Sequence, residues 1–288
     1  CFAFDEVHFR LNQSLQPGDK IRIQSTGANG LTYGVDFLEI EETGEPIGQP
    51  AGSYSVVDFG AVPDDGVDDY AAITACIAAA DAAGKDVYFP EGTFHINQIW
   101  RVSASNMMIT GAGMWFTNIQ FTNSGQQKGG ISGAGDGSTY NIEFCNMYIN
   151  SNLRSRYGEN AIYKCFMDVF DGNSLIHDIW EEHFECGFWV GDYNGSLDYS
   201  DNIKIVNSRI RNNLADGVNF CQGTSNATVY NCSIRNNGDD GLAMWNNNYM
   251  SAKDESNNVF CYNTIDLTWR AGAIAIYGGD GHKVYNNY

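Results

Sequence analysis

Basic side chains are scarce in this chain: across 288 residues, 16 Lys and Arg stand against 35 Asp and Glu, a net charge of −19. Nucleic acids and anionic membranes bind proteins with a basic surface, so neither is expected as a partner. An anionic polysaccharide would be repelled as well. A neutral ligand fits this charge best. The 6 Trp, 16 Tyr and 16 Phe are typical of carbohydrate binding or of an aromatic core.

No two of the 8 cysteines form a Cys-x-x-Cys motif, so zinc and redox motifs have no support. Most cysteines are expected to be small buried residues, and one or two disulfides are the alternative in a secreted protein. The sequence contains no apolar run that could span a membrane and no signal peptide. It begins at Cys1 and stops at Tyr288 in what looks like another repeat, so we expect a piece of a longer protein.

A repeated pattern occupies residues 207–220 and 231–244. Both copies contain Ile-Arg-Asn-Asn followed by Asp-Gly, and an offset of 24 residues places Asp216 on Asp240. A period of this length is typical of stacked repeats, in which each unit must pack on its neighbours to bury a core. Matching asparagines, Asn207 with Asn231 and Asn212 with Asn236, would form stacked amide ladders.

The repeat alternates apolar and polar residues in short runs separated by Asn, Gly and Asp, which predicts short strands joined by tight turns. We therefore predict an all-β fold, a right-handed parallel β-helix with matching residues of successive coils about 4.8 Å apart. Asp216 should then lie beneath Asp240, with Asp239 beside them. Like charges this close raise a pKa, which favours a shared proton or a bound cation.

Residues 1–47 differ from the rest of the chain, with alternating runs at 7–11, 20–23 and 36–40 separated by Gly-rich turns. We predict that they are the C-terminal part of a β-sandwich domain of the jelly-roll type. Residues 44–52 would be the linker. Residues 48–288 would form the β-helix catalytic domain, probably truncated at its C-terminus.

A capping helix is expected at the start of the β-helix. Asp68 or Asp69 can begin it, apolar residues recur at helical spacing, and Gly84 ends it. Such a helix covers the open end of a solenoid, which otherwise exposes strand edges. The acidic cluster at Asp64, Asp65, Asp68 and Asp69 reads as a turn and helix cap in preference to a metal site.

Alignment of the coils predicts further neighbours of the three aspartates. Gly187, Gly217, Gly241 and Gly272 fall in one column. Two residues earlier, the column places Glu185 and Arg270 around Asp239. Trp269 would stand over Gly238 at the edge of the acidic patch.

Glycoside hydrolysis fits this cluster of carboxylates. Such enzymes need one carboxylic acid and one carboxylate, about 6.5–9.5 Å apart in inverting enzymes and about 5–5.5 Å apart in retaining ones. Asp216 and Asp240 could together hold and deprotonate a water. Asp239 could be the acid, with a pKa raised by its two anionic neighbours. A solvated turn is the alternative for the Asn-Gly-Asp-Asp-Gly stretch alone.

Candidate substrate contacts are aromatic: Trp245, Trp269 and Tyr249 could stack on sugar rings, and a core position is the alternative for each. Glu185 and Arg270 are further candidates because of their place beside the aspartates. The metal content cannot be assigned. No cofactor is required by this chemistry, and a structural Ca²⁺ is possible on so acidic a surface, although no Ca²⁺-binding loop pattern is present.

Several motifs carry a resemblance to known families. Residues 56–61, the expected helix and residues 88–94 look like the entry to pectate-lyase-like β-helix enzymes. The three aspartates are similar to those of inverting polygalacturonases, but the Gly-His-Gly and Arg-x-Lys motifs of that family are absent. The closer resemblance, through residues 18–25, 36–40, 215–219 and 238–241, is to glycoside hydrolase family 87, the bacterial α-1,3-glucanases and mycodextranases.

That resemblance covers nearly all of the chain and implies a secreted, extracellular bacterial enzyme. It implies an inverting endo-hydrolase of α-1,3-glucan whose catalytic acids are Asp216, Asp239 and Asp240. Its partners would be neutral polysaccharides, namely α-1,3-glucan and nigero-oligosaccharides, and it would act as a monomer. A mycodextranase acting on nigeran stays open. So do a Ca²⁺-dependent polysaccharide lyase, which the lack of a basic column disfavours, and a non-catalytic carbohydrate-binding β-helix.

Overall fold

The computed structural model describes residues 4–24, 27, 34–125, 127–156, 163–192, 195–247 and 253–288. The chain divides into two compact units. One unit contains the residues up to Glu6 together with Pro46–Tyr288, and the other is Val7–Glu45.

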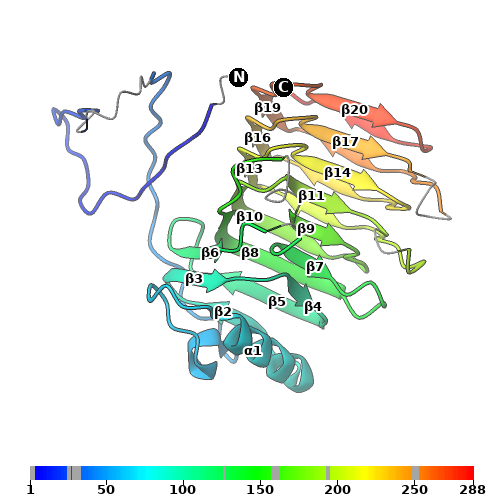
Figure 1. Ribbon diagram of the computed structural model, residues 1–288, viewed down its shortest axis with the longest axis horizontal. Coiled ribbons are helices and arrows are strands. Elements are labelled where there is room, and N and C mark those ends of the chain that lie inside the picture. Colours follow the sequence, from blue (N-terminus) through cyan, green and yellow to red (C-terminus); the bar gives the residue numbers. More distant parts are fainter. Residues whose placement is uncertain are drawn as a thin grey trace. The chain divides into compact units, whose positions relative to one another are not determined.

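The larger unit is a coil of parallel strands with three faces (Figure 1). The first face contains β1 (Tyr54–Ser55), β2 (Val87–Phe89), β5 (Ser105–Gly111), β8 (Tyr140–Ser151), β10 (Leu175–Glu182), β12 (Lys204–Val206), β15 (Thr228–Tyr230), β18 (Val259–Cys261) and β21 (Lys283–Tyr285). The second contains β3 (Gly92–Ile96), β6 (Thr117–Phe121), the ends of β8 and β10, β13 (Arg209–Arg211), β16 (Ser233–Arg235) and β19 (Thr264–Asp266). The third contains β4 (Trp100–Val102), β7 (Ile131–Gly133), β9 (Lys164–Asp168), β11 (Cys186–Val190), β14 (Val218–Cys221), β17 (Leu242–Trp245) and β20 (Ile274–Tyr277).

Strand register confirms the predicted repeat. Ile210 pairs with Ile234, and Val218 pairs with Leu242, both at an offset of 24 residues. Every strand pair is parallel, and the chain returns to each face once per coil. The right-handed parallel β-helix is therefore confirmed, with the hand that connections between parallel strands normally take.

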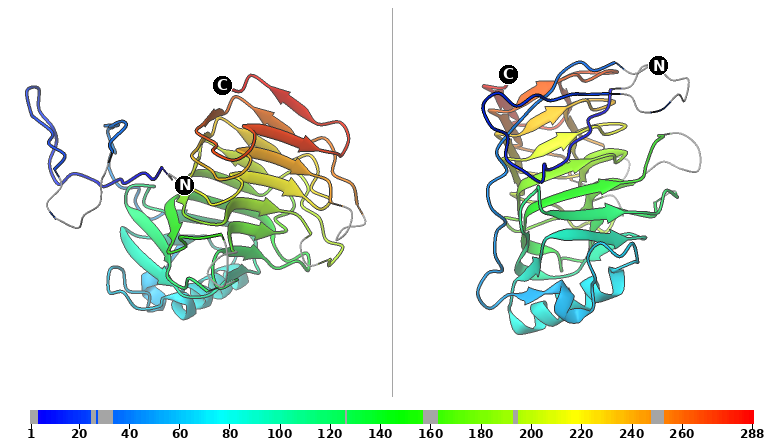
Figure 2. Two further views of the ribbon diagram at one scale, coloured as in Figure 1. Left: turned by 45° about the horizontal axis from the view of Figure 1, so that its top comes forward. Right: turned by 90° about the vertical axis from the view of Figure 1, so that its left-hand side faces the viewer.

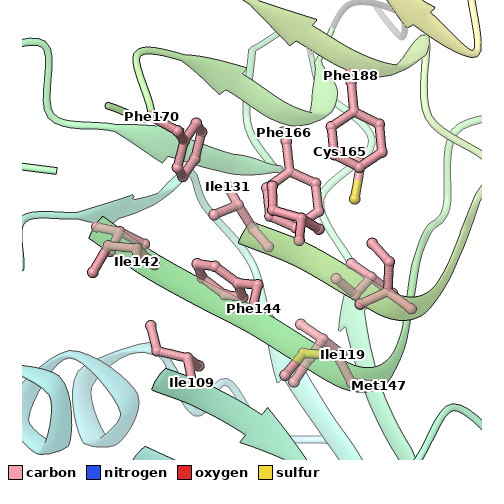
Figure 3. Packing of buried hydrophobic residues seen from close by; sticks show 14 of the residues in the cluster. Ile109, Ile119, Ile131, Ile142, Phe144, Met147, Cys165, Phe166, Phe170 and Phe188 are labelled. Carbon is pink, nitrogen blue, oxygen red and sulfur yellow. The ribbon is translucent and has the colours of Figure 1, made fainter. Parts of the chain in front are cut away.

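The core lies inside the coil and is built from inward-pointing residues of the three faces. Figure 3 shows part of it, with Phe144, Phe166 and Phe188 in adjacent layers. The rings of Phe166 and Phe188 are stacked with centroids 4.9 Å apart, and those of Phe144 and Phe166 meet edge to face at 5.4 Å. Because successive strands lie one spacing apart, aromatic rings on neighbouring coils contact each other directly.

A helix covers the start of the coil, as the sequence predicts. The 3₁₀-helix η1 (Val56–Phe59) leads to α1 (Tyr70–Ala83), which lies across the end of the β-helix in Figures 1 and 2. Ile73 and Ile77 on α1 join the core, and Gly84 ends the helix in a left-handed conformation. Asp69 holds the position before α1, but its carboxylate accepts hydrogen bonds from the backbones of Val62 and His95 instead of capping the helix.

The predicted asparagine ladders are present at the bends of the coil. Asn231 Nδ2 donates to Asn207 Oδ1 at 2.8 Å, and Asn236 Nδ2 donates to Asn212 Oδ1 at 2.6 Å. All four residues have positive φ, between 51° and 57°. Asparagine tolerates this left-handed conformation better than most residues, so it both turns the chain and links the coils.

Residues 7–45 contain none of the predicted strands among their described positions. Phe9, Ile23 and Ile40 point to solvent there. A strand needs a partner to satisfy its backbone N–H and C=O groups, and the described residues of this unit supply none. The β-sandwich and the division into 1–47 and 48–288 therefore stay predictions. Ile47 already belongs to the larger unit, since its carbonyl accepts a hydrogen bond from Tyr88.

The seven cysteines of the described ranges are buried, and none of them forms a disulfide there. Their expected role as small buried residues is therefore confirmed for those positions. Within the same ranges, no helix is long and apolar enough to cross a membrane.

Candidate active site

The three predicted aspartates meet where the chain enters the third face of the coil. Asp216 lies two residues before β14, and Asp240 lies two residues before β17. The Asp240 backbone N–H donates to Asp216 Oδ1 at 3.0 Å. One oxygen from each carboxylate, including that of Asp239, lies within 4.8 Å of the others. The predicted stacking of Asp216 beneath Asp240 is confirmed.

Glycine after each stacked aspartate permits this close approach of the coils. A Cβ on Gly217 would lie 2.5 Å from the Gly241 carbonyl oxygen, and a Cβ on Gly241 would lie 2.7 Å from the Ala273 carbonyl oxygen. Real Cβ atoms do not come this close to backbone atoms, so a side chain here would push the coils apart. The Asp-Gly pair therefore holds the carboxylates at one coil spacing.

Asp216 is the most enclosed of the three carboxylates. It is 8% exposed, and its Oδ2 accepts a hydrogen bond of 2.9 Å from Asn219 Nδ2. Burial raises the pKa of Asp216 to about 6, and the charges of Asp239 and Asp240 act in the same direction. The hydrogen bonds from Asn219 and from the Asp240 backbone oppose that shift. Asp216 therefore changes its protonation state near neutral pH.

Asp240 is held by two donors from the coil above. The Gly272 N–H donates to Oδ1 at 2.8 Å, and the Tyr277 hydroxyl donates to Oδ2 at 2.9 Å. Tyr277 lies at the end of β20 and is largely exposed. This hydrogen bond is the main cause that raises the pKa of Tyr277. Sequence reasoning missed Tyr277, although its place beside Trp245 on the next coil is the signal that could have found it.

Asp239 carries two cationic partners. Arg156 Nη1 lies 2.7 Å from Asp239 Oδ2, and Arg270 Nη2 lies 3.4 Å from the same oxygen. A third of the Asp239 side chain is exposed, so it is the most accessible of the three aspartates. The predicted proximity of Arg270 is therefore present. Arg156 was missed, because nothing in the sequence connects a loop 83 residues away with this turn.

Glu185 adds a fourth carboxylate one coil below. Its Oε2 lies 2.7 Å from Lys164 Nζ, and its Oε1 lies 3.7 Å from Arg156 Nε. The side chain of Glu185 is 11% exposed. The patch thus combines four carboxylates with three cations. Lys164 was also missed, because β9 lies outside the repeated pattern.

Aromatic side chains border the carboxylates. Trp245, at the end of β17, is 37% exposed, and its ring meets that of Trp189 edge to face at 5.4 Å. Trp269 is 39% exposed and lies under the Arg270 guanidinium, 5.2 Å from its ring centroid. Trp189 on β11 was missed, although its outward position in the alternation of that strand could have marked it. Tyr249 lies outside the described residues.

The predicted alignment above β17 is wrong by one residue. Leu242 pairs with Ile274, so Gly272 lies over Asp240 and not over Gly241. This register stacks the core side chains of Leu242 and Ile274 on each other, and the alternation of a strand allows no other choice. Trp269 still reaches Gly238, whose added Cβ would lie 2.6 Å from the Trp269 ring.

Fold and site together define a class: a β-helix protein with a carboxylate cluster and exposed tryptophans, arranged for chemistry on a carbohydrate chain. Residues 66–288 match the family described as alpha-1,3-glucanase catalytic domain D2. The match covers more than half of the chain, so the chain belongs to this family.

Solved structures agree with this assignment. The Agl-KA catalytic domain is 55% identical, with a TM-score of 0.82 over 86% of this chain and 44% of that one. The catalytic unit of the thermostable GH87 alpha-1,3-glucanase from Streptomyces thermodiastaticus strain HF3-3 is 27% identical, with a TM-score of 0.73 over 86% of this chain and 42% of that one. The chain thus spans less than half of either structure.

Mannuronan C5-epimerase AlgE3 from Azotobacter vinelandii is a more distant relative. It is 30% identical over 198 residues, which are 66% of this chain and 9% of the epimerase. The likeness therefore concerns a small part of that protein.

Proposed function

We propose that this chain is catalytic material of an endo-acting, inverting glycoside hydrolase that cleaves α-1,3-glucosidic linkages in α-1,3-glucan. The observation that carries the proposal is the set of three carboxylates, Asp216, Asp239 and Asp240, gathered within 4.8 Å beside exposed tryptophans. Hydrolysis of a glycosidic bond needs one carboxylic acid and one carboxylate, and this set supplies both. Membership of the α-1,3-glucanase catalytic-domain family supports it.

The substrate class follows from the charge of the site and from relatives. Arg156, Lys164 and Arg270 offset most of the charge of the four carboxylates, which suits a neutral sugar chain. Solved GH87 alpha-1,3-glucanase structures contain nigerose or tetrasaccharides. In three such structures single aspartates are replaced by alanine, at positions separated by 23 residues and then by 1, the intervals that separate Asp216, Asp239 and Asp240.

In the proposed mechanism, Asp216 and Asp240 hold a water molecule, and Asp216 takes its proton as the hydroxyl attacks the anomeric carbon. A base with a pKa of about 6 is matched to reaction near neutral pH. Asp239, the most accessible carboxyl, gives a proton to the departing glycosidic oxygen. The proton lost by water and the proton gained by the leaving sugar balance over the cycle.

Arg156 and Arg270 bear on the acid role of Asp239. Both guanidinium groups favour its ionised form, which is the form left after proton donation. A substrate hydroxyl that takes over the Arg156 hydrogen bonds would release Asp239 to carry a proton. We therefore propose that substrate binding and protonation of Asp239 are coupled.

The stereochemical course is a separate part of the proposal. A separation within 4.8 Å is closer to the 5–5.5 Å of retaining enzymes than to the 6.5–9.5 Å of inverting ones. Inversion is favoured by the hydrogen bonds, because both oxygens of Asp216 and of Asp240 accept hydrogen bonds, which weakens either group as a nucleophile. Proton NMR of the first product formed decides between the two, since inversion gives the β-anomer from an α-linkage.

The test of the function is reducing-sugar release from insoluble α-1,3-glucan, with nigeran and polygalacturonate as comparison substrates. Asp239→Asn is expected to abolish release from α-1,3-glucan, and Asp58→Asn, an exposed aspartate of η1, to leave it unchanged. Release only from nigeran would identify a mycodextranase. Release from none of the three, or equal release by wild type and Asp239→Asn, would overturn the hydrolase assignment in favour of a binding protein.

The remaining attributes are expectations tied to this function. No cofactor is required for the proposed hydrolysis, so a chelator should leave it intact, whereas a Ca²⁺-dependent lyase would stop and its unsaturated product would absorb in the ultraviolet. Insoluble polysaccharide lies outside the cell, so we propose a secreted bacterial enzyme. We propose that it acts as a monomer, to be tested by light scattering.

A further inference from the structure

A second group of chemically reactive side chains lies on the outer surface of the first face. Cys145 on β8 pairs with His177 on β10, and Glu143 lies two residues before Cys145. Their inward-pointing neighbours Phe144 and Ile176 join the core, so these three side chains share the opposite side of the sheet. The carboxylates of the proposed active site belong to the third face, so this group is not part of them.

The donor atoms of this group are spaced as in a metal site. His177 Nε2 lies 3.0 Å from Glu143 Oε1, and Cys145 Sγ lies 4.0 Å from the same oxygen. All three donor atoms lie within 4.8 Å of one another. A tetrahedral Zn²⁺ with bonds of about 2.0–2.3 Å separates its ligand atoms by about 3.3–3.8 Å. Shifts of well under 1 Å would therefore bring the three atoms onto one ion.

Neighbouring groups already orient these donors. Asp178 Oδ2 lies 2.6 Å from His177 Nδ1, an arrangement that keeps a proton on Nδ1 and turns Nε2 toward Glu143. Carboxylates hold metal-binding histidines in this way. The backbone of Asp178 has a φ of 50°, which bends β10 at this residue. Asn146 Nδ2 donates to Cys145 Sγ at 3.3 Å and so favours the thiolate, the form of cysteine that binds metals.

A proton is the competitor for the same position. The hydrogen bond with Cys145 is the largest cause that raises the pKa of His177 to about 10, and those with Asp178 and Glu143 add to it. The imidazole is therefore protonated at neutral pH when nothing else bridges the donors. A divalent cation would displace the protons of His177 and Cys145, so its binding releases protons to solvent.

We propose that Glu143, Cys145 and His177 bind one Zn²⁺ ion at the surface of the coil, with Asp178 orienting His177 and water as the fourth ligand. One thiolate, one imidazole and one carboxylate form a donor set that suits Zn²⁺ and Co²⁺, whereas Ca²⁺ and Mg²⁺ prefer oxygen alone. Cys145 is 1% exposed, and the side chains of His177 and Glu143 are 22% and 40% exposed, so the site is open on its outer side. The ion would link β8 to β10.

Co²⁺ is the probe that tests this proposal, because thiolate ligation to Co²⁺ gives a charge-transfer band in the near ultraviolet. Titration of the full chain is expected to show this band at one equivalent, with Zn²⁺ abolishing it by competition. Cys145→Ser should remove the band, and Cys76→Ser, which changes another buried thiol, should keep it. Asp178→Asn should weaken binding about 10- to 100-fold, the usual effect of losing an orienting carboxylate.

Two results would overturn the proposal. The first is a wild-type titration without a thiolate band, including binding of Co²⁺ only by oxygen ligands, as at Asp216, Asp239 and Asp240. The second is a band that survives in Cys145→Ser. If Cys145→Ser fails to fold, the anomalous diffraction of Zn²⁺ soaked into wild-type crystals replaces it, and a peak away from Cys145 Sγ has the same meaning. None of these readouts depends on glucanase activity.

Discussion

The early and late coils of the β-helix solve the same packing problem in different ways. Ten of the twelve largest fully buried side chains, from Phe89 to Phe188, lie in the early coils, and only Phe220 and Phe260 lie in the late ones. The late coils bury smaller residues such as Ile210 and Ile234. They add asparagine ladders at their bends.

Coil length follows the same division. Paired residues on the first face are separated by 22, 35, 32 and 29 residues in the early coils, and by 24, 31 and 24 in the late ones. Large rings can fill the irregular spaces of coils with unequal loops. Equal coils instead repeat side-chain positions, which is what places Asp216 under Asp240. Regularity in this molecule therefore serves the candidate active site.

The largest expected effect is on catalysis, which this comparison assigns to the late coils. Asp240→Asn should lower kcat/KM on α-1,3-glucan by about 10²–10⁴-fold, since it removes a carboxylate that helps to hold the attacking water. Asp58→Asn, at the early end of the coil, should have no effect. Steady-state kinetics with soluble oligosaccharides measure both. Similar losses in the two variants would show that the late coils have no special role.

Next in size is the cost of opening the aromatic core. Phe166→Ala should lower the free energy of unfolding by about 3–5 kcal/mol, because the ring contacts Phe144, Phe170 and Phe188. Ile234→Val in the late coils should cost about 0.5–1.5 kcal/mol. Guanidinium denaturation compares them. A smaller loss in Phe166→Ala than in Ile234→Val would contradict the view that rings dominate the early core.

A pH effect separates catalysis from stability at Asp216. Its pKa is about 6 in the folded protein against 3.8 for an ordinary aspartate, so the folded state holds more protons between these values. Stability therefore falls as pH rises from about 4 to about 6, by roughly 3 kcal/mol from this group. Asp216→Asn should lose activity but remove this part of the fall.

The amide in Asp216→Asn can be accommodated, because Asn219 Oδ1 accepts no hydrogen bond from any described residue and can turn to accept one. Urea denaturation at pH 4 and pH 7 measures the difference between variant and wild type. Other buried carboxyls, such as Glu181, contribute equally to both proteins. A wild-type profile parallel to that of the variant would mean that Asp216 ionises normally.

The smallest expected effect concerns the asparagine ladders. Asn213 Nδ2 donates to Glu181 Oε1 at 2.8 Å and to Asn237 Oδ1 at 2.9 Å inside the coil. Asn213→Ala should cost about 1–3 kcal/mol, the penalty of leaving buried acceptors unpaired. Asn231→Gly, in an exposed ladder with positive φ, should change stability by less than about 0.5 kcal/mol. Thermal unfolding ranks the two, and an equal cost would refute a specific role for the buried ladder.

Much of the architecture was predictable from the sequence. The 24-residue repeat fixed the pairing of Ile210 with Ile234 and the stacking of Asp216 and Asp240, because an equal coil length leaves one register that keeps apolar residues inside. The helix that covers the coil and its end at Gly84 followed from local spacing and from the left-handed conformation that glycine adopts readily.

Prediction failed where coil lengths change. The 32-residue step from β17 to β20 shifted the expected alignment by one residue, so Gly272 and not Ala271 lies over Asp240. Loop lengths cannot be counted reliably into a register, since only the fit of side chains inside the coil decides it. The strands predicted in residues 7–45 found no partner among the described residues, and alternation alone does not make a strand.

The sequence by itself determined the β-helix, its equal late coils and the column of aspartates, because these depend on residues one period apart. Only the tertiary structure decided which distant groups surround that column. Arg156, Lys164 and Tyr277 reach it from coils and loops outside the repeat. It likewise decided that Cys145 meets His177 on the outer surface, since two strands 32 residues apart share a face only after the coil has closed.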